Sequence, residues 1–323
     1  MIEISNSYDR NKESLNRFLS TVNYSKFNLW PNITSQATTN FLINELNEKS
    51  KLGKLFIVKQ NQQVLGLLLF VNLEWDTIHF GFSSGKIEFL FIDENLDNDT
   101  IQESLTLMLS SFQKFCNSSN VIFVSLSVNS WQKKIINHLQ KFNFRYVLTW
   151  IDGFLPSEIN FPITDDGVKV SLIRKEEINF FQELSSKHYF KGGRFHFDDN
   201  FEKEKVNGMY HNLVQASYEN QDVLLVARVK EEPVGLFICK KIVPNRNLNN
   251  IKIAALRYLI VDPQYRKMKI GHNLFIKTIQ ILGKESDLIT TGLEAHNLAS
   301  LNLHLKLGFI FNNTHCAFHW WNK

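Results

Sequence analysis

The spacing of hydrophobic positions divides the N-terminal half of the chain into helices and strands. Apolar residues three and four apart predict helices on both sides of a polar turn at Pro31, within residues 11–50, and further on across 100–116 and 131–141. Short β-branched and aromatic runs predict strands at 54–58, 64–71, 87–92, 121–127 and 144–150. The first two strands form a hairpin around a polar turn, and the second is apolar enough to be buried on both faces.

The C-terminal half repeats this order of elements. Its pattern predicts strands at 167–173, 223–229, 234–240, 253–261, 288–294, 309–311 and 316–321, with helices at 175–187, 202–218, 270–282 and 297–306. We therefore expect a tandem repeat of one mixed α/β unit, each unit a mixed sheet with flanking helices. The polar, proline-containing stretch 156–166 is the expected boundary, which gives domains 1–160 and 161–323.

Residues 73–82 form an unusual local segment. Trp75, His79 and two phenylalanines gather around Gly81, and this composition predicts an aromatic-rich turn between strands. Two interpretations stay open. The turn is either a packed corner, or its polar groups face a ligand.

A basic loop stands between the strand ending at Val261 and the helix beginning near Ile270. It carries Arg266, Lys267 and Lys269. A helix N-terminus has unpaired N–H groups and a partial positive charge, so this loop can seat a phosphate, although a basic turn is also common at a merely solvated helix start. The matching loop of the first half, 93–99, is acidic and lacks glycine. We expect it to repel a pyrophosphate, so that only the second half binds such a ligand.

Composition narrows the class of protein. The 323 residues are 44% hydrophobic, enough for two ordinary cores, and the net charge of +4 does not demand nucleic acid. Three dispersed cysteines argue against a disulfide framework. The chain shows no spacing typical of a zinc site, no secretion signal and no membrane-length apolar run, so we expect a cytoplasmic protein without a metal site, nucleic-acid partner or membrane.

Two motifs resemble those of the GNAT acetyltransferases. The spacing Arg266-x-x-Lys269-x-Gly271 resembles the family's acetyl-CoA signature, Arg/Gln-x-x-Gly-x-Gly/Ala, with Lys269 in place of one glycine. The segment from Asn297 to Phe309 resembles the second signature, with Ser300 at its small-residue position. The resemblance implies a tandem GNAT-like fold with a degenerate first unit, and an N-acetyltransferase that uses acetyl-CoA as its co-substrate.

The resemblance also assigns roles. The residues that it places against acetyl-CoA are Leu259, Ile260, Val261, Arg266, Lys267, Met268, Lys269, Ile270, Gly271 and Asn297. His304 stands where the family has a tyrosine that protonates the leaving thiolate, and Glu294 is the candidate for relaying the amine proton. The alternatives are a packed core histidine, a solvated strand-end glutamate and, for Asn297, an ordinary helix N-cap.

Within the GNAT enzymes, residues from about 72 to the end resemble the dTDP-fucosamine acetyltransferases. The shared features are the Trp75 turn, Arg194-Phe195, Tyr210 and the aromatic C-terminal strand. This likeness implies a small-molecule amine substrate, namely an amino-sugar nucleotide of the dTDP-4-amino-4,6-dideoxyhexose type. Arg194, His196 and Tyr210 are its candidate ligands. A GNAT for another small amine and an inactive CoA-binding module stay as alternatives, and homodimer formation stays open.

Overall fold

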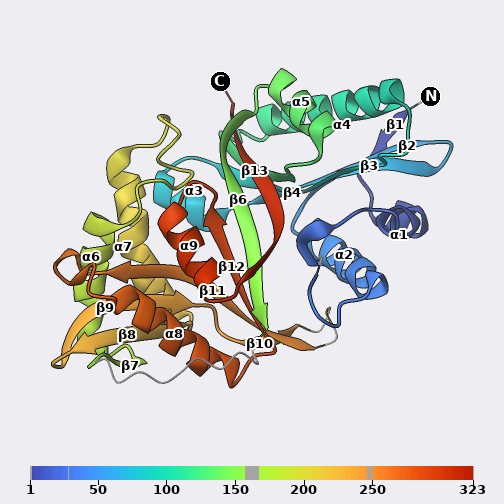
Figure 1. The fold of residues 1–323 in the computed structure, drawn as a ribbon. Coiled ribbons are helices and arrows are strands. Elements are labelled where there is room, and N and C mark those ends of the chain that lie inside the picture. Colours follow the sequence, from blue (N-terminus) through green and yellow to red (C-terminus); the bar gives the residue numbers. More distant parts are fainter. Residues whose placement is uncertain (1, 28, 157–166, 246–247, 249, 323) are drawn as a thin grey trace. The chain divides into compact units, whose positions relative to one another are not determined.

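The chain forms two compact units. The computed structural model describes residues 2–27, 29–156, 167–245, 248 and 250–322 (Figure 1). Unit 1 comprises Met1–Thr149 and Thr314–Lys323, and unit 2 comprises Trp150–Asn313. Of the expected boundary segment, residues 157–166 lie outside the described part of the chain. In both units helices flank a sheet, which confirms the predicted mixed α/β class.

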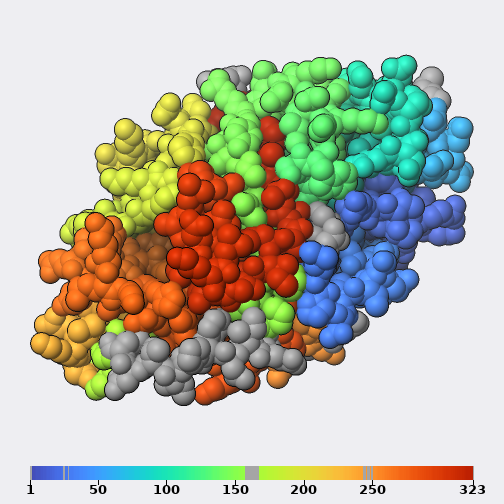
Figure 2. Space-filling model, viewed as in Figure 1, coloured from blue at the N-terminus to red at the C-terminus, as the bar shows by residue number. Residues whose placement is uncertain are grey.

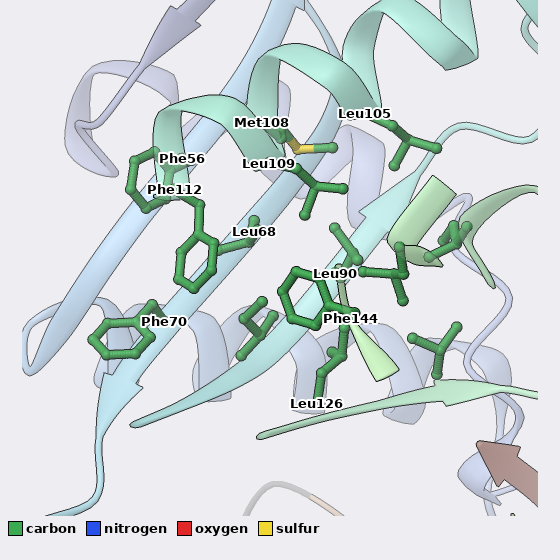
Figure 3. Close-up of a cluster of buried hydrophobic side chains, with 14 of the residues drawn as sticks. Phe56, Leu68, Phe70, Leu90, Leu105, Met108, Leu109, Phe112, Leu126 and Phe144 are labelled. Carbon is green, nitrogen blue, oxygen red and sulfur yellow. The ribbon is translucent and has the colours of Figure 1, made fainter. Parts of the chain in front are cut away.

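Unit 1 is a mixed sheet with helices on its faces. Its strands are β1 (Glu3–Ser5), β2 (Gly53–Gln60), β3 (Gln63–Asn72), β4 (Ser84–Ile92), β5 (Phe123–Asn129), the start of β6 (Arg145–Pro156) and the end of β13 (Ile310–Trp321). Its α-helices are α1 (Lys12–Leu19), α2 (Ser35–Ser50), α3 (Glu74–Phe80), α4 (Asn98–Ser118) and α5 (Lys133–Lys141). Helix α4 packs Met108 and Phe112 onto Phe70 and Leu126 of the sheet (Figure 3).

The predicted aromatic-rich turn at 73–82 is wrong, because Glu74–Phe80 forms helix α3. The helix ends at Gly81, whose φ of 80° lies in the left-handed region that glycine adopts without strain. Trp75 and His79, one helical turn apart, stack with ring centroids 4.8 Å apart. Acidic residues in the first turn and a glycine after the last are ordinary helix signals that the aromatic composition concealed.

Unit 2 has three layers, with its sheet between two helical layers. Its strands follow the order β6, β12 (Leu288–Glu294), β11 (Ile251–Val261), β9 (Glu232–Cys239), β8 (Val223–Val229), β7 (Lys169–Leu172), and β10 (Val243–Asn245) pairs with β11. Helices α6 (Ile178–His188) and α7 (Lys203–Glu219) pack on one face, where Leu224 and Leu236 point. Helix α8 (Ile270–Gly283) packs on the other, with Leu225 and Phe237. Alternate residues of the same strands therefore serve both cores.

Two strands end in a different unit from the one in which they begin. Trp150–Pro156 of β6 pair with β12 of unit 2, whereas His315–Trp321 of β13 pair antiparallel with β5 of unit 1. The two short strands predicted at 309–311 and 316–321 are one continuous strand. The last strand of the chain thus completes the sheet of unit 1.

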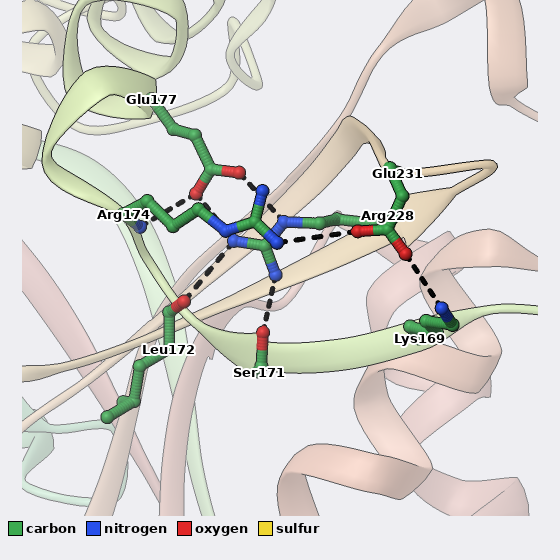
Figure 4. A network of polar contacts seen from close by, with 7 residues as sticks. All are labelled: Lys169, Ser171, Leu172, Arg174, Glu177, Arg228 and Glu231. Atoms are coloured by element: carbon green, nitrogen blue, oxygen red, sulfur yellow. Dashed lines mark hydrogen bonds and ion pairs between the residues drawn. The ribbon is translucent and has the colours of Figure 1, made fainter.

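A buried ion pair fixes the edge of unit 2. The Arg228 guanidinium donates from Nε and Nη2 to the two carboxylate oxygens of Glu177, at 2.7 and 2.6 Å (Figure 4). Arg228 is 2% and Glu177 6% exposed. The guanidinium also donates to Ser171 Oγ and Leu172 O, and the Glu177 carboxylate accepts from the Arg174 N–H, so the buried charges are well bonded. Among the described residues, no helix has the length and apolarity needed to cross a membrane.

Candidate active site

Strands β11 and β12 diverge in the middle of the unit 2 sheet. Their parallel pairing in the described chain runs from Ile253↔Leu288 to Ala255↔Thr290. Beyond this point β11 pairs with β9 through a register shift between Leu256 and Tyr258, while β12 pairs with β6. The two strands therefore separate from each other toward Val261 and Glu294.

The diverging edge of β11 presents backbone amides. The Asp262 N–H donates to Val234 O of β9 at 2.9 Å, and in an antiparallel ladder alternate residues point to the same neighbour. The N–H groups of Leu259 and Val261 consequently point away from β9, toward the side where β12 has diverged. The family resemblance places acetyl-CoA against these residues, and backbone donors of this kind stabilise the oxyanion that develops on a thioester.

The basic loop leads directly into the N-terminus of α8. Arg266, Lys267, Met268 and Lys269 are all exposed, and Ile270 is buried as the first residue of the helix. Lys267 and Lys269 have φ of 64° and 60°, so both adopt the left-handed conformation. The orange and red atoms of α8 and α9 (Leu298–Lys306) lie on the surface that Figure 2 shows. The loop therefore offers cations and helix N–H groups to solvent.

Arg266 has a second role within the protein. Its Nε donates to Val261 O and its Nη2 donates to His188 O at the end of α6, both at 3.2 Å. These bonds tie the loop to the segment that follows α6. Gly271 has space for a Cβ, which would stand 3.5 Å from Val261 Cγ2, so an alanine there is sterically permitted.

The equivalent helix start in unit 1 is closed by its own side chain. Asp97 caps α4 by accepting from the Thr100 N–H at 2.8 Å and from Thr100 Oγ1 at 2.7 Å. These bonds lower the pKa of Asp97, so a negative charge occupies the end of α4. In α8 the N-cap is Lys269, and no side chain of the described residues caps the helix. The contrast supports the expectation that unit 2 alone binds the cofactor.

The left-handed backbone conformation of Lys269 explains why the GNAT signature has glycine at this position. A non-glycine residue in the left-handed region is strained, whereas glycine is not. We expect Lys269→Gly to raise the free energy of unfolding by about 0.5–1 kcal/mol, after the entropy cost of the added glycine. Urea unfolding would measure the change. Lys284→Gly is the matched control, because the φ of Lys284 is −73°, which is ordinary helix geometry, and glycine there should destabilise the fold. A loss of stability in both variants would show that Lys269 is not strained.

A cluster of polar groups surrounds Gly193. A Cβ at this position would stand 3.0 Å from Tyr210 OH, 3.7 Å from His196 Nδ1 and 3.8 Å from Glu294 Oε1. The structure thus brings together Tyr210 and His196, predicted for the substrate, and Glu294, predicted for proton transfer. The absence of a side chain at Gly193 lets the backbone approach all three groups closely.

Burial changes the acid–base behaviour of this cluster. Burial raises the pKa of Glu294, partly offset by hydrogen bonds including one from Asn297 and by the charge of His296. Burial also raises the pKa of Tyr210, and the Glu294 charge raises it further. The phenol stays neutral at pH 7. A carboxylate with a raised pKa is a better proton acceptor than a solvated one, as expected of a general base.

Tyrosine rings form one wall of the cluster. Tyr189 stacks on Tyr210 with centroids 4.1 Å apart, and Tyr258 of β11 lies 5.9 Å from Tyr210. His196 Nε2 lies 2.7 Å from Tyr189 OH, and that hydroxyl donates to Asn207 Oδ1. Burial lowers the pKa of His196, with a contribution from the charge of Lys191, so the ring is neutral near pH 7.

His304 and Asn297 have partners within the fold. His304 is 5% exposed, with Nε2 2.9 Å from Thr291 Oγ1 and Nδ1 2.7 Å from Ser300 O. Burial lowers its pKa. These contacts favour a packed, neutral histidine over a proton donor to a thiolate, and the acid role stays a prediction. Asn297 caps α9 by accepting from the Ser300 N–H.

Sequence reasoning missed part of the site. Tyr189 and Tyr258 were not among the predicted site residues, nor were Phe190 and His296, which pack beside Gly192. Tyr258 immediately precedes the predicted thioester-binding residues, so its position in the strand was the available signal. Arg194 lies next to Gly193, with its guanidinium 4.6 Å from the Phe195 ring centroid.

Known proteins resemble this chain in sequence and in fold. Residues 181–309 match the Acetyltransferase (GNAT) family. No curated protein has a matching sequence. The matched stretch lies within unit 2 and confirms the predicted class of enzyme, an acetyltransferase.

Solved structures extend the likeness to the whole chain. A tandem GNAT protein from the clavulanic acid biosynthesis pathway aligns with a TM-score of 0.58 at 10% identity, over 99% of this chain and 98% of that one. A GCN5-related N-acetyltransferase from Sphaerobacter thermophilus aligns with a TM-score of 0.66 at 7% identity, over 99% and 95%. At such identities the likeness shows the fold alone, and it confirms the predicted tandem GNAT fold.

Proposed function

We propose that the protein transfers the acetyl group of acetyl-CoA to the amino group of an amino-sugar nucleotide. The cluster of Glu294, Tyr210 and His196 around Gly193 is the observation that carries the proposal. It lies in the same unit as the diverged edge of β11, and Arg266 connects the two parts, since its charge acts on Tyr258 and its side chain bonds to His188 O. Unit 2 thus has both a cofactor seat and a proton acceptor.

The reaction needs an uncharged amine and a polarised thioester. Glu294 accepts a proton from the ammonium group through water, and the free amine attacks the thioester carbon. The N–H groups of Leu259 and Val261 bind the oxygen that becomes negative. As the C–N bond forms and the C–S bond breaks, the nitrogen loses its second proton and the departing thiolate takes up one proton, so the products are the neutral amide and the thiol.

The residues present fit acetyl-CoA. Phosphate groups suit the α8 N-terminus with Lys267 and Lys269, because the helix end is uncapped among the described residues and positively charged. We name Glu294, Tyr210 and His196 the acid cluster. Arg194 supplies a cation next to it, and the diphosphate of a nucleotide sugar requires such a cation. This cation and the motif likeness support the nucleotide-sugar acceptor over a simple amine.

Thiol release during acetyl transfer tests the proposal. The purified protein is mixed with acetyl-CoA and a dTDP-4-amino-4,6-dideoxyhexose, and we expect thiol release that depends on the amino sugar. Release with amino acids or polyamines instead would establish a GNAT for another small amine. Acetyl-CoA binding without release for any amine would identify an inactive CoA-binding module.

His304 has a test of its own. We expect His304→Phe to lower the free energy of unfolding by about 1–3 kcal/mol, because Thr291 and the Ser300 carbonyl lose a buried partner. Turnover at saturating substrates should change little at a temperature where the variant is folded. A large fall in kcat with unchanged acetyl-CoA affinity would instead establish His304 as the thiolate acid.

A further inference from the structure

Three rings form an exposed platform at the edge of the acid cluster. The Phe190 and His296 centroids lie 5.7 Å apart with planes 30° apart, and Phe197 meets His296 edge-on at 5.3 Å. Phe190 is 43% and Phe197 53% exposed, and His296 is exposed as well. We name Phe190, His296 and Phe197 the ring platform. A flat ligand that stacks on these rings removes their apolar surface from water, which is favourable in free energy.

Gly192 joins the ring platform to the acid cluster. A Cβ at Gly192 would stand 2.4 Å from Phe190 Cε1 and 2.6 Å from His296 Nε2, so the backbone itself lies against these rings. The next residue, Gly193, lies against Tyr210 and Glu294. Consecutive Cα atoms are about 3.8 Å apart, so one short peptide segment separates the rings from the proton acceptor.

Three kinds of chemistry meet along this segment. Glu294 and Tyr210 suit the reacting amine, Arg194 adds a cation that acts on the Tyr210 hydroxyl, and the ring platform presents π faces. An acceptor with an amine, an anionic group and a planar ring has one group for each. A polyamine acceptor has no planar group that could stack on the ring platform.

We propose that the ring platform binds the nucleobase of the acceptor by stacking. The proposal rests on the proposed function, because it assigns one part of the same acceptor. It adds Phe190, Phe197 and His296 to the substrate site and makes them determinants of specificity for nucleotide-linked amines. Stacking on an aromatic side chain tolerates different bases, because every base has a π face.

The test separates the base from the phosphates. Binding of dTDP and of inorganic pyrophosphate is measured by titration calorimetry for the wild type, Phe197→Ala, Phe197→Tyr and the control Phe180→Ala. Phe180 is 38% exposed on α6 and contacts Phe181. We expect Phe197→Ala to weaken dTDP binding about tenfold, the order found when a base loses one stacking partner. Phe197→Tyr and Phe180→Ala should retain the affinity, and pyrophosphate binding should be equal in all four proteins.

Three results of the titrations would overturn the platform. They are dTDP affinity within twofold of wild type in Phe197→Ala, an equal loss of pyrophosphate binding, and no dTDP binding by the wild type at millimolar ligand. The proposed function is judged separately by thiol release. Release with an amine that lacks a nucleotide, at an undiminished rate, would leave the acetyltransferase and exclude the platform. Loss of dTDP binding in Phe197→Ala, with no thiol release for any amine, would support the platform as a nucleotide-binding site and overturn the acetyltransferase.

Discussion

Glu294→Gln is expected to lower kcat/KM for the amine by about 10²–10³-fold, which is the usual contribution of a general base. The amide is nearly isosteric, so Tyr210 and Gly193 should keep their positions. The affinity for acetyl-CoA should stay within about twofold, because Glu294 belongs to the acceptor side. Steady-state kinetics of thiol release and calorimetry with acetyl-CoA measure the two effects. Glu204→Gln, an exposed glutamate of α7, is the control and should be silent.

The pH dependence gives a second measure of the same residue. Burial raises the pKa of Glu294, so the carboxylate forms only above a pH higher than for a solvated glutamate. The acid limb of kcat/KM should therefore fall as pH drops through this raised pKa, and Glu294→Gln should flatten it. A wild-type limb that persists in Glu294→Gln would assign it to another group.

Stability distinguishes catalysis from folding at this site. A carboxyl whose folded pKa is raised destabilises the fold when it ionises, so the penalty is fully present above the folded pKa and is lost as the pH falls to the pKa of the unfolded chain. Glu294→Gln removes the penalty, and its free energy of unfolding at pH 7 should equal or exceed that of the wild type. A variant that is inactive because it is unfolded would show the opposite.

The sequence predicted those parts of the fold that depend on local patterns. Strands 223–229 and 288–294 have the expected bounds, because short apolar and β-branched runs between flanking turns mark their ends. The aromatic helix α3 was missed because Trp75 and His79 stack on one another and leave no apolar stripe of helical period. The exchange of β6 and β13 between the two units also escaped prediction, since strand partners are chosen by tertiary contacts rather than local sequence.

The candidate site was predicted unevenly for a similar reason. Motif spacing placed Arg266 and Lys269 in the second half, the end of a predicted strand placed Glu294 there, and the structure has all three in unit 2. The hydrogen bond between His304 and Thr291 joins α9 to β12, so motif position alone could not reveal a packed environment. Phe190 and His296 meet across 106 positions of sequence, and only the folded chain shows their stacking.

Glu177→Leu is expected to be the most destabilising of these changes, by about 3–5 kcal/mol, because it leaves the Arg228 guanidinium buried without its counter-charge. The charge cannot reach water, since Arg228 is 2% exposed, and Ser171 Oγ and Leu172 O offer it only dipoles. Urea unfolding of wild type and variant measures the difference. Glu231→Leu is the control: that glutamate is 57% exposed in its pairs with Lys169 and Arg174, and loss of a solvated pair costs at most about 1 kcal/mol.

The double variant Glu177→Leu with Arg228→Met separates the pair from its surroundings. Removing both charges replaces a buried ion pair by apolar groups of similar size, which is often neutral for stability. We therefore expect the double variant to regain most of the stability lost by Glu177→Leu. If the double variant is as unstable as the single one, the cost arises from packing at the β8 edge rather than from an unpaired charge. The ion pair would then hold Ser171 and Arg174 in register with β8 instead of neutralising Arg228.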